Sequence, residues 1–403
     1  MQIRQISERM AEKRICDGRK IQEQRGTPAM RCIIVNSSDI FEYRVKLLRT
    51  VLRELGYEVT VIASDYRHIE KVKRQTEDPD FRLLPTLPYA KNISVRRILS
   101  HLDFAHKALC SIRHEDCDLL YLVVPPNAQA GIASAYKKKH PETRVIMDVI
   151  DLWPESLPIA GTDRFPFTIW SGLRNRNLKY ADTIITECRL YHQYIRRFAA
   201  ESRLRTVYWC HGPESADRKP AGEMYSPDPG KWVLGYLGSI NNIIDIDGIA
   251  AAVSFFAKDK PVAVRIVGGG EKEEAFAEAC RCAGAEVIRY GKIYDPAKKQ
   301  EIFSACHYGI NIMKKTVTVG LSMKSVDYME MGLPILNGLS GDTYDFVKEE
   351  KIGRNLDALD YAYDEKMRAN ARAFYEKHCS FEAYKKAMKQ ILTEQQDFEE
   401  VGG

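Results

Sequence analysis

The sequence lacks the short motifs that mark the best-known nucleotide and metal sites. It has no GxxxxGK[ST] motif, which argues against a P-loop nucleotide-binding protein, and no HExxH zinc motif. The loop after the first predicted strand, residues 36–39, has no GxGxxG, so the dinucleotide fingerprint is missing from its usual place. We therefore expect no protein-bound metal and no bound cofactor.

Long apolar runs are also missing. The most apolar stretch, residues 119–135, is interrupted by Pro125, Pro126, Asn127 and Gln129, so the sequence predicts no membrane-spanning helix. The charged N-terminus has no apolar segment of the signal-peptide kind. The ten cysteines are scattered without a CxxC pair, which is typical of a reduced protein. Together these features predict a cytoplasmic location.

The composition is that of a folded protein of two or three domains, with 403 residues of which 45% are hydrophobic. A net charge of +5 does not by itself predict a nucleic-acid partner, and we expect none. Residues 1–210 hold 35 Lys and Arg against 25 Asp and Glu, whereas residues 211–403 hold 25 against 30. The basic first half, with runs at 137–139, 174–179 and 196–197, predicts contact with an anionic membrane surface; the alternative is a set of solvated helix faces.

Short apolar runs alternate with amphipathic segments along most of the chain. Between the first two runs, Val45, Leu48, Leu52 and Leu55 recur at helical spacing, and Gly56 ends that helix. Such alternation predicts parallel sheets with helices on both faces. The strands are expected at 32–35, 59–62, 119–124, 145–147, 183–185, 232–236, 263–267, 287–290, 308–312 and 334–336.

The alternation lapses once, in a Pro- and Gly-rich stretch, and then restarts. The predicted fold class is therefore α/β, with two Rossmann-like doubly wound domains that face each other across a central cleft. The expected divisions are an N-terminal extension at 1–29, a first domain at 30–211, a linker at 212–230, a second domain at 231–379, and a C-terminal helix and tail at 380–403. In such sheets ligands bind outside the carboxyl ends of the strands, so the loops there are the candidate sites.

An acidic segment follows the fourth predicted strand. It contains Asp148, Asp151, Trp153 and Glu155. One interpretation is that a carboxylate or Ser156 caps a following helix while the indole packs. The functional interpretation is a set of hydrogen-bond acceptors for hydroxyl groups of a ligand, with one carboxylate near a reacting centre.

Two glycine-containing loops follow strands of the second domain. Gly238, before Ser239, would let a ligand approach the backbone closely, with amide groups directed at an anion. The run 268–270 could act in the same way. A plain turn is the alternative for both loops.

The segment 319–335 carries the most specific pattern. Ser322 is placed as the N-cap of a helix that Gly332 ends, and Lys324 lies in its first turn. A helix N-terminus with a lysine in its first turn can bind phosphate. Asp327, about one turn further on, could accept a hydrogen bond from a ribose hydroxyl. The alternative is an exposed lysine and aspartate on a surface helix.

Four segments carry a resemblance to known proteins. They are GYEVTV at 56–61, DVIDLWPES at 148–156, IVGGG at 266–270 and SMKSVDYMEMGLP at 322–334. In their order they resemble the GT-B glycosyltransferases, and in particular the retaining enzymes of family 4. The resemblance implies a nucleotide-sugar donor on the second domain, an acceptor on the first, transfer with retained anomeric configuration, and no metal.

The resemblance also implies roles for individual residues. Ser322, Met323 and Lys324 would meet the donor diphosphate, with Asp327 at the ribose. Lys292 and Ile293 would flank the base, Gly238 and Ser239 would lie under the phosphates, and Asp151 would lie near the acceptor and the donor sugar, with Asp148, Trp153 and Glu155 on the acceptor side.

The chain departs from the family pattern at four positions. The first of two family glutamates is Val319 here, and the second is Asp327. Two cationic phosphate partners are replaced by Ser239 and Ile244, which makes Lys314 and Lys315, just after a predicted strand, the best substitute cations.

The function predicted from these features is a hexosyltransferase-type, metal-independent retaining glycosyltransferase. It would move a sugar, expected from a UDP-sugar, to a glycan or lipid-linked acceptor in cell-envelope polysaccharide synthesis, at the inner face of the membrane. Two alternatives are a non-catalytic relative that binds a nucleotide sugar or a partner, and a sugar-nucleotide epimerase on the same fold.

Overall fold

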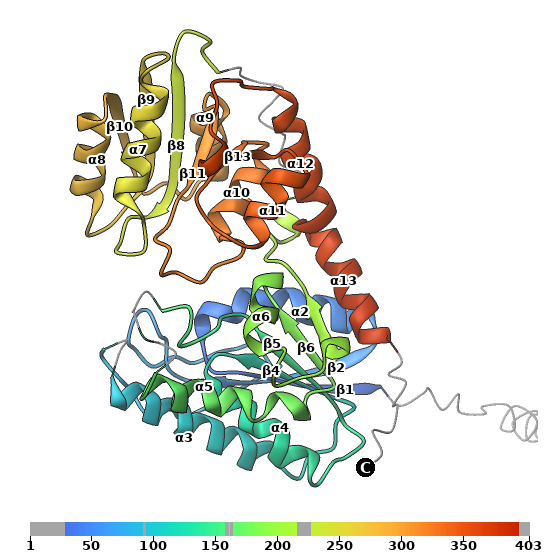
Figure 1. Ribbon diagram of the computed structural model, residues 1–403. Coiled ribbons are helices and arrows are strands. Elements are labelled where there is room, and N and C mark those ends of the chain that lie inside the picture. The colour runs from blue at the N-terminus through green and yellow to red at the C-terminus, as the bar shows by residue number, and fades with distance from the viewer. Residues whose placement is uncertain (1–28, 92–93, 158–160, 162–163, 216–226, 395–403) are drawn as a thin grey trace, which may run out of the picture.

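The computed structural model describes residues 29–91, 94–157, 161, 164–215 and 227–394. The predicted N-terminal extension, apart from residue 29, most of the predicted linker and the end of the predicted tail lie outside the described residues. The chain forms two lobes, and its last helix runs from the second lobe back to the first (Figure 1).

The first lobe contains a seven-stranded parallel sheet in the order β3-β2-β1-β4-β5-β6-β7. The central order 3-2-1-4-5-6 is that of a Rossmann-like domain. The strands are β1 (Met30–Asn36), β2 (Tyr57–Ser64), β3 (Phe81–Leu84), β4 (Leu119–Val124), β5 (Arg144–Val149), β6 (Thr183–Thr186) and β7 (Leu204–Thr206). The helices are α2 (Glu42–Glu54), α3 (Val95–Ile112), α4 (Ala130–Lys137), α5 (Phe167–Asn175) and α6 (His192–Ile195).

The second lobe repeats this architecture with six parallel strands in the order β10-β9-β8-β11-β12-β13. Its strands are β8 (Trp232–Ser239), β9 (Val262–Gly269), β10 (Ala285–Gly291), β11 (Tyr308–Asn311), β12 (Ile335–Asn337) and β13 (Gly353–Asn355). Its helices are α7 (Ile246–Phe256), α8 (Glu273–Cys282), α9 (Pro296–Ser304), α10 (Met323–Glu330), α11 (Asp342–Glu349) and α12 (Lys366–His378), and α13 (Phe381–Thr393) follows. The predicted pair of doubly wound α/β domains is confirmed.

The alternation of side chains along each strand gives each sheet two apolar faces. In β1, Ile33 packs with Phe104 of α3 on one face, and Ile34 packs with Leu48 of α2 and Met388 of α13 on the other. The C-terminal helix therefore completes the core of the first lobe.

The lobes also contact each other at the N-terminus of α11. The carboxylate of Asp342, which is 1% exposed, accepts hydrogen bonds from the backbone N–H groups of Arg189 and Leu190 in the first lobe, each at 2.8 Å. The loop before α10 lies against the same part of the first lobe, because a Cβ on Gly320 would meet Cys188 Sγ at 2.8 Å. Within the described ranges, no helix combines the length and the apolar character needed to cross a membrane.

Candidate functional site

A hollow lies at the carboxyl edge of the second sheet. The ends of β8 and β9 and the loop after β10 form its wall, together with residues of α9 and α10. Residues singled out in three separate sequence segments line it together: Gly238, Ser239, Lys292, Ile293 and Asp327. This is the edge of a parallel sheet at which ligands bind.

Backbone rather than side chains forms part of this hollow. Gly238 and Gly268 lie opposite each other in the β8–β9 pair, with φ of +119° and +146°, conformations that residues with a Cβ rarely adopt. A Cβ on Gly268 would overlap the carbonyl oxygen of Gly238. The two glycines therefore hold the strand ends close together and let a ligand approach their peptide groups.

Lys324 reaches this region from the first turn of α10. Its Nζ lies 3.2 Å from the hydroxyl oxygen of Tyr236 and 4.4 Å from the centre of that ring, and a Cβ on Gly238 would lie 4.0 Å from Lys324 Cε. Burial lowers the pKa of the Lys324 ammonium to about 8, because desolvation penalises its charged form. A partly desolvated cation beneath a backbone-lined hollow suits an anionic ligand.

Ser322 caps α10, as the sequence predicts. Its Oγ accepts from the N–H of Ser325 at 3.2 Å and donates to Asn311 Oδ1 at 2.8 Å. These bonds hold the helix against β11. Met323 is 57% exposed at the same helix end.

Asp327 lines the hollow and also contacts the segment that links the lobes. His211 Nε2 lies 3.1 Å from Asp327 Oδ1, and His211 Nδ1 lies 3.2 Å from Glu330 Oε2. These three side chains bring their ligand atoms within 4.8 Å of one another, so they form a candidate metal centre among the described residues. The imidazole ring lies between the two carboxylates and contacts both of them, so the three side chains hold one another in place.

The expected substitute cation Lys314 and the substituted position Ile244 both lie outside this hollow. Lys314 is exposed and lines another hollow with Asn337 and Tyr344, so the structure does not place it with Gly238 and Asp327. Ile244 is buried in the core of the second lobe.

Two of the acidic residues expected on the acceptor side have structural partners. Asp148 is fully buried, where it accepts from Arg44 Nε at 2.6 Å and from Tyr121 Oη at 2.7 Å. Its carboxylate therefore stabilises the interior of the first lobe and does not line the cleft. Glu155 forms a bidentate ion pair with the buried Arg174, at 2.6 and 3.2 Å.

Asp151 lies beyond the end of β5, next to Glu187 beyond β6. The strand register pairs Val149 with Thr186, so the two acids leave neighbouring strands at almost the same level. Burial raises the pKa of Asp151. Burial, together with the charges of Asp151 and Asp148, raises the pKa of Glu187 to about 8, so its carboxyl group holds a proton at neutral pH. Sequence reasoning missed Glu187, although the rule about strand ends applies to it as it does to Asp151.

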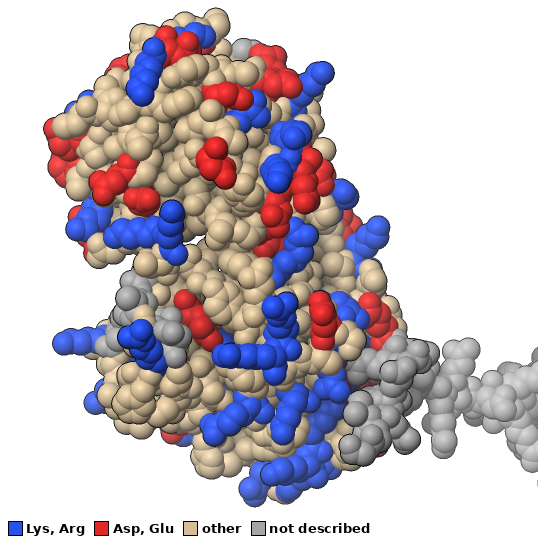
Figure 2. Space-filling view, viewed as in Figure 1, with Lys and Arg blue, Asp and Glu red and all other residues tan. Residues whose placement is uncertain are grey.

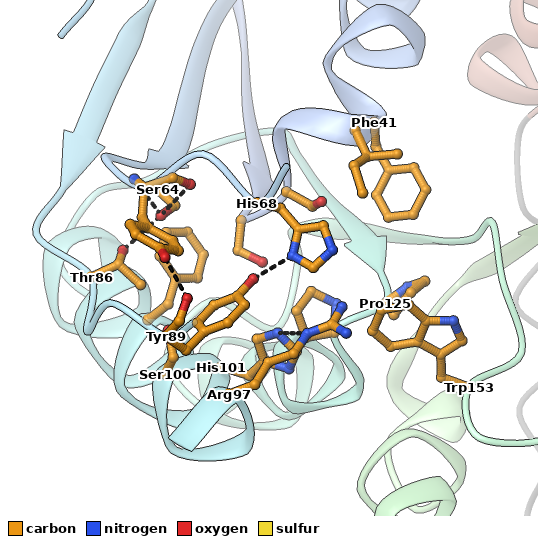
Figure 3. A pocket seen from close by; sticks show the side chains of 16 residues that line it. Phe41, Ser64, His68, Thr86, Tyr89, Arg97, Ser100, His101, Pro125 and Trp153 are labelled. Atoms are coloured by element: carbon orange, nitrogen blue, oxygen red, sulfur yellow. Dashed lines mark hydrogen bonds between the residues drawn. The ribbon is translucent and has the colours of Figure 1, made fainter. Parts of the chain in front are cut away.

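A second hollow lies at the carboxyl edge of the first sheet (Figure 3). Trp153, predicted on the acceptor side, is part of its wall, and so are Ser37 after β1, Ser64 at the end of β2 and Pro125 after β4. Arg97 and His101 enter it from α3. Sequence reasoning missed both, because nothing in the helical pattern separates them from other polar residues of α3.

Comparison with solved structures identifies the class of fold, the GT-B fold of glycosyltransferases. Sucrose-phosphate synthase from Thermosynechococcus elongatus is similar over 90% of this chain and 98% of its own, with a TM-score of 0.65 and 13% identity. HepE of Anabaena, in complex with UDP and glucose, gives a TM-score of 0.58 and 11% identity over 90% of this chain and 99% of its own. The lipopolysaccharide outer core galactosyltransferase WaaB gives a TM-score of 0.58 and 13% identity, over 90% of this chain and 99% of its own. No family model and no curated protein matches the sequence.

Proposed function

We propose that the protein is a glycosyltransferase that takes its sugar from a nucleotide-sugar donor. The observation that carries this proposal is the hollow of the second lobe, which Gly238, Gly268 and Asp327 line within a GT-B fold. Lys324 lies next to it, against Gly238. HepE, which shares the fold, is described in complex with UDP and with UDP-glucose. We therefore take a UDP-sugar as the donor.

Each of these residues would have its own role in the reaction. When the bond between the anomeric carbon and the diphosphate breaks, negative charge builds up on the leaving group. The Lys324 ammonium and the backbone amides of the β8 loop would offset that charge, which is the basis for proposing a metal-independent reaction. Asp327 would accept from the ribose, and Lys292 and Ile293 would border the base. Asp151 would lie near the acceptor, and we propose transfer with retained configuration.

A thermal-shift series with UDP-, GDP- and ADP-glucose tests the donor proposal. A bound donor stabilises the fold by RT ln(1 + [L]/Kd), about 2.7 kcal/mol at a hundred times Kd, so UDP-glucose should give the largest rise in melting temperature. Slow release of glucose to water should accompany binding. Binding without any turnover would favour a non-catalytic relative, and interconversion of free nucleotide sugars would favour an epimerase.

We propose further that the first lobe contacts an anionic membrane that carries a lipid-linked acceptor for envelope polysaccharide. On α3, Val95, Leu99 and Leu102 lie on one helical face and are exposed. Basic side chains gather on this lobe (Figure 2), and Lys138, Arg176 and Lys179 border one shallow hollow. Arg174, which the sequence places in the same basic run, is buried and does not contribute.

Sedimentation with phosphatidylglycerol vesicles tests this contact. Wild-type protein should bind at low salt and dissociate at 0.5 M salt, because each basic residue near the surface contributes up to about 1 kcal/mol that salt screens. Lys179→Gln should weaken binding about fivefold, the equivalent of about 1 kcal/mol, whereas Lys258→Gln on the second lobe should not change it. No binding at low salt would refute the membrane contact.

A further inference from the structure

The segment between β7 and β8 passes from the first lobe to the second and carries His211 (Figure 1). Before His211, Cys210 is 3% exposed and packs in the core of the first lobe. After it, the backbone N–H of Gly212 donates to the hydroxyl oxygen of Tyr43 on α2, and a Cβ on Gly212 would lie 2.5 Å from that oxygen. The first lobe therefore fixes the backbone on both sides of His211.

The side chain of His211 contacts the second lobe instead. Its Nε2 lies 3.1 Å from Asp327 Oδ1. Its Nδ1 lies 3.2 Å from Glu330 Oε2 and 3.3 Å from the hydroxyl oxygen of Tyr375. Asp327 and Glu330 are about one turn apart on α10, and Tyr375 belongs to α12. Two helices of the second lobe thus hold the imidazole ring, whose side chain is 16% exposed.

The contact with His211 occupies one oxygen of the Asp327 carboxylate. A carboxylate can only accept hydrogen bonds, so the hydrogen in this contact belongs to Nε2. Among the described residues, no other side chain bonds or pairs with Asp327, which is 26% exposed and lines the hollow of the second lobe. Its Oδ2 therefore keeps its lone pairs for a ligand.

The bond from His211 also fixes the orientation of this carboxylate. A carboxylate that could rotate freely would have to be ordered by the ligand, and binding would lose the corresponding side-chain entropy. Because the imidazole ring orders Asp327 beforehand, a hydroxyl group of the ligand meets an acceptor that is already in place.

We propose that His211 is a positioning residue for the donor: it holds Asp327 Oδ1, so that Oδ2 accepts a hydrogen bond from a hydroxyl group of the nucleotide ribose. The inference rests on the proposed function, because the ribose is that of the nucleotide-sugar donor. It adds that recognition of the ribose depends on a residue whose backbone the first lobe holds. In this role His211 acts through Asp327 and takes no part in the chemical step.

Isothermal titration with UDP and with 2′,3′-dideoxy-UDP, each with and without EDTA, tests the proposal. Wild-type protein should bind UDP at least about tenfold more tightly than dideoxy-UDP, in the range of a hydrogen bond to a charged group. His211→Phe keeps an aromatic ring but cannot donate. It should lower this ratio at least about threefold, the scale for ordering one side chain, and leave the affinity for dideoxy-UDP within about twofold of wild type.

Two further variants separate positioning from a general structural role. His211→Gln can still donate to Asp327 and should restore most of the ratio. His378→Phe is the matched control, because His378 belongs to α12, packs against Phe374 and does not contact Asp327. Its ratio should equal that of wild type. If His211→Phe shows no cooperative melting transition, His211→Ala takes its place with the same expectation.

The outcomes distinguish this inference from the donor proposal. An unchanged ratio in His211→Phe, an equal loss of affinity for both nucleotides, or equal binding of both by wild-type protein would each overturn the inference while leaving UDP binding in place. A ratio that disappears with EDTA would assign the three side chains to a metal and would also overturn it. Wild-type protein that binds no UDP would contradict the donor proposal, and the inference would fail with it.

Discussion

Lys324→Ala is expected to lower kcat/KM for sugar transfer at least ~100-fold, the scale for removing one preorganised group that stabilises charge in the transition state. Two other lysines, Lys292 and Lys299, line the hollow, but Lys324 is the one that lies against Gly238, where the diphosphate is proposed to bind. The family positions for basic residues hold Ser239 and the buried Ile244, and Lys314 lines a different hollow. Lys324, below Gly238, is therefore expected to carry much of the charge compensation.

The pH profile gives the same assignment an independent test. Burial lowers the pKa of Lys324 to about 8, so the free enzyme holds this cation below pH 8 and loses it as the pH rises further. In steady-state measurements kcat/KM should fall above pH 8. Lys324→Arg should flatten that fall, since a guanidinium group stays charged throughout this range.

Two further variants serve as comparisons. Lys298→Ala removes an exposed lysine of α9 and should leave the rate unchanged. Asp327→Ala should raise KM for the donor with little change in kcat, because a ribose contact is similar in the ground and transition states. Near wild-type turnover by Lys324→Ala with intact donor binding would contradict the placement of the phosphate site.

The fold was predictable because its central strands are buried on both sides. Each of the ten predicted strands has a counterpart, from β1 at 30–36 to β12 at 335–337, and Gly56 follows α2 with a φ of +83° as expected for a helix end. The strands not predicted are β3, β7 and β13, all at sheet edges. Edge strands are short and only partly covered, so a sequence such as Gly353–Asn355 carries no apolar run that would indicate a strand.

The candidate site was predictable only in part, for a different reason. The rule about strand ends correctly gathered Gly238, Lys292 and Asp327, because the backbone topology brings those loops together. The rule could not show which acidic side chains would be buried and paired with a cation inside the lobe. Asp148 and Asp151 are three residues apart, yet Arg44 of α2 pairs with the first alone. Such partners come from distant segments, which the sequence of one loop does not contain.

Gly268→Ala is expected to have the largest effect on stability. A methyl group there would overlap the carbonyl oxygen of Gly238, and φ of +146° is a conformation that alanine rarely adopts. The overlapping atom belongs to the backbone of a paired strand, so the ends of β8 and β9 must separate. Strain of this kind costs on the order of 3 kcal/mol, which corresponds to a melting temperature roughly 5–10 °C lower for a domain of this size.

Gly269→Ala is the matched control, one residue further along β9. A Cβ there would meet Glu273 Oε2 at 3.1 Å and Lys292 Cε at 3.7 Å, both of which are ends of flexible side chains that can move aside. Its melting temperature should stay within about 2 °C of wild type, as for a change that moves only surface side chains. Gly238, Gly268 and Gly269 all line the hollow. Because the methyl group of Gly268→Ala alone pushes against the backbone of Gly238, that variant should also lose UDP-dependent stabilisation, whereas Gly269→Ala should keep it. Equal melting temperatures for the two variants would show that the strand ends are not held in this close contact.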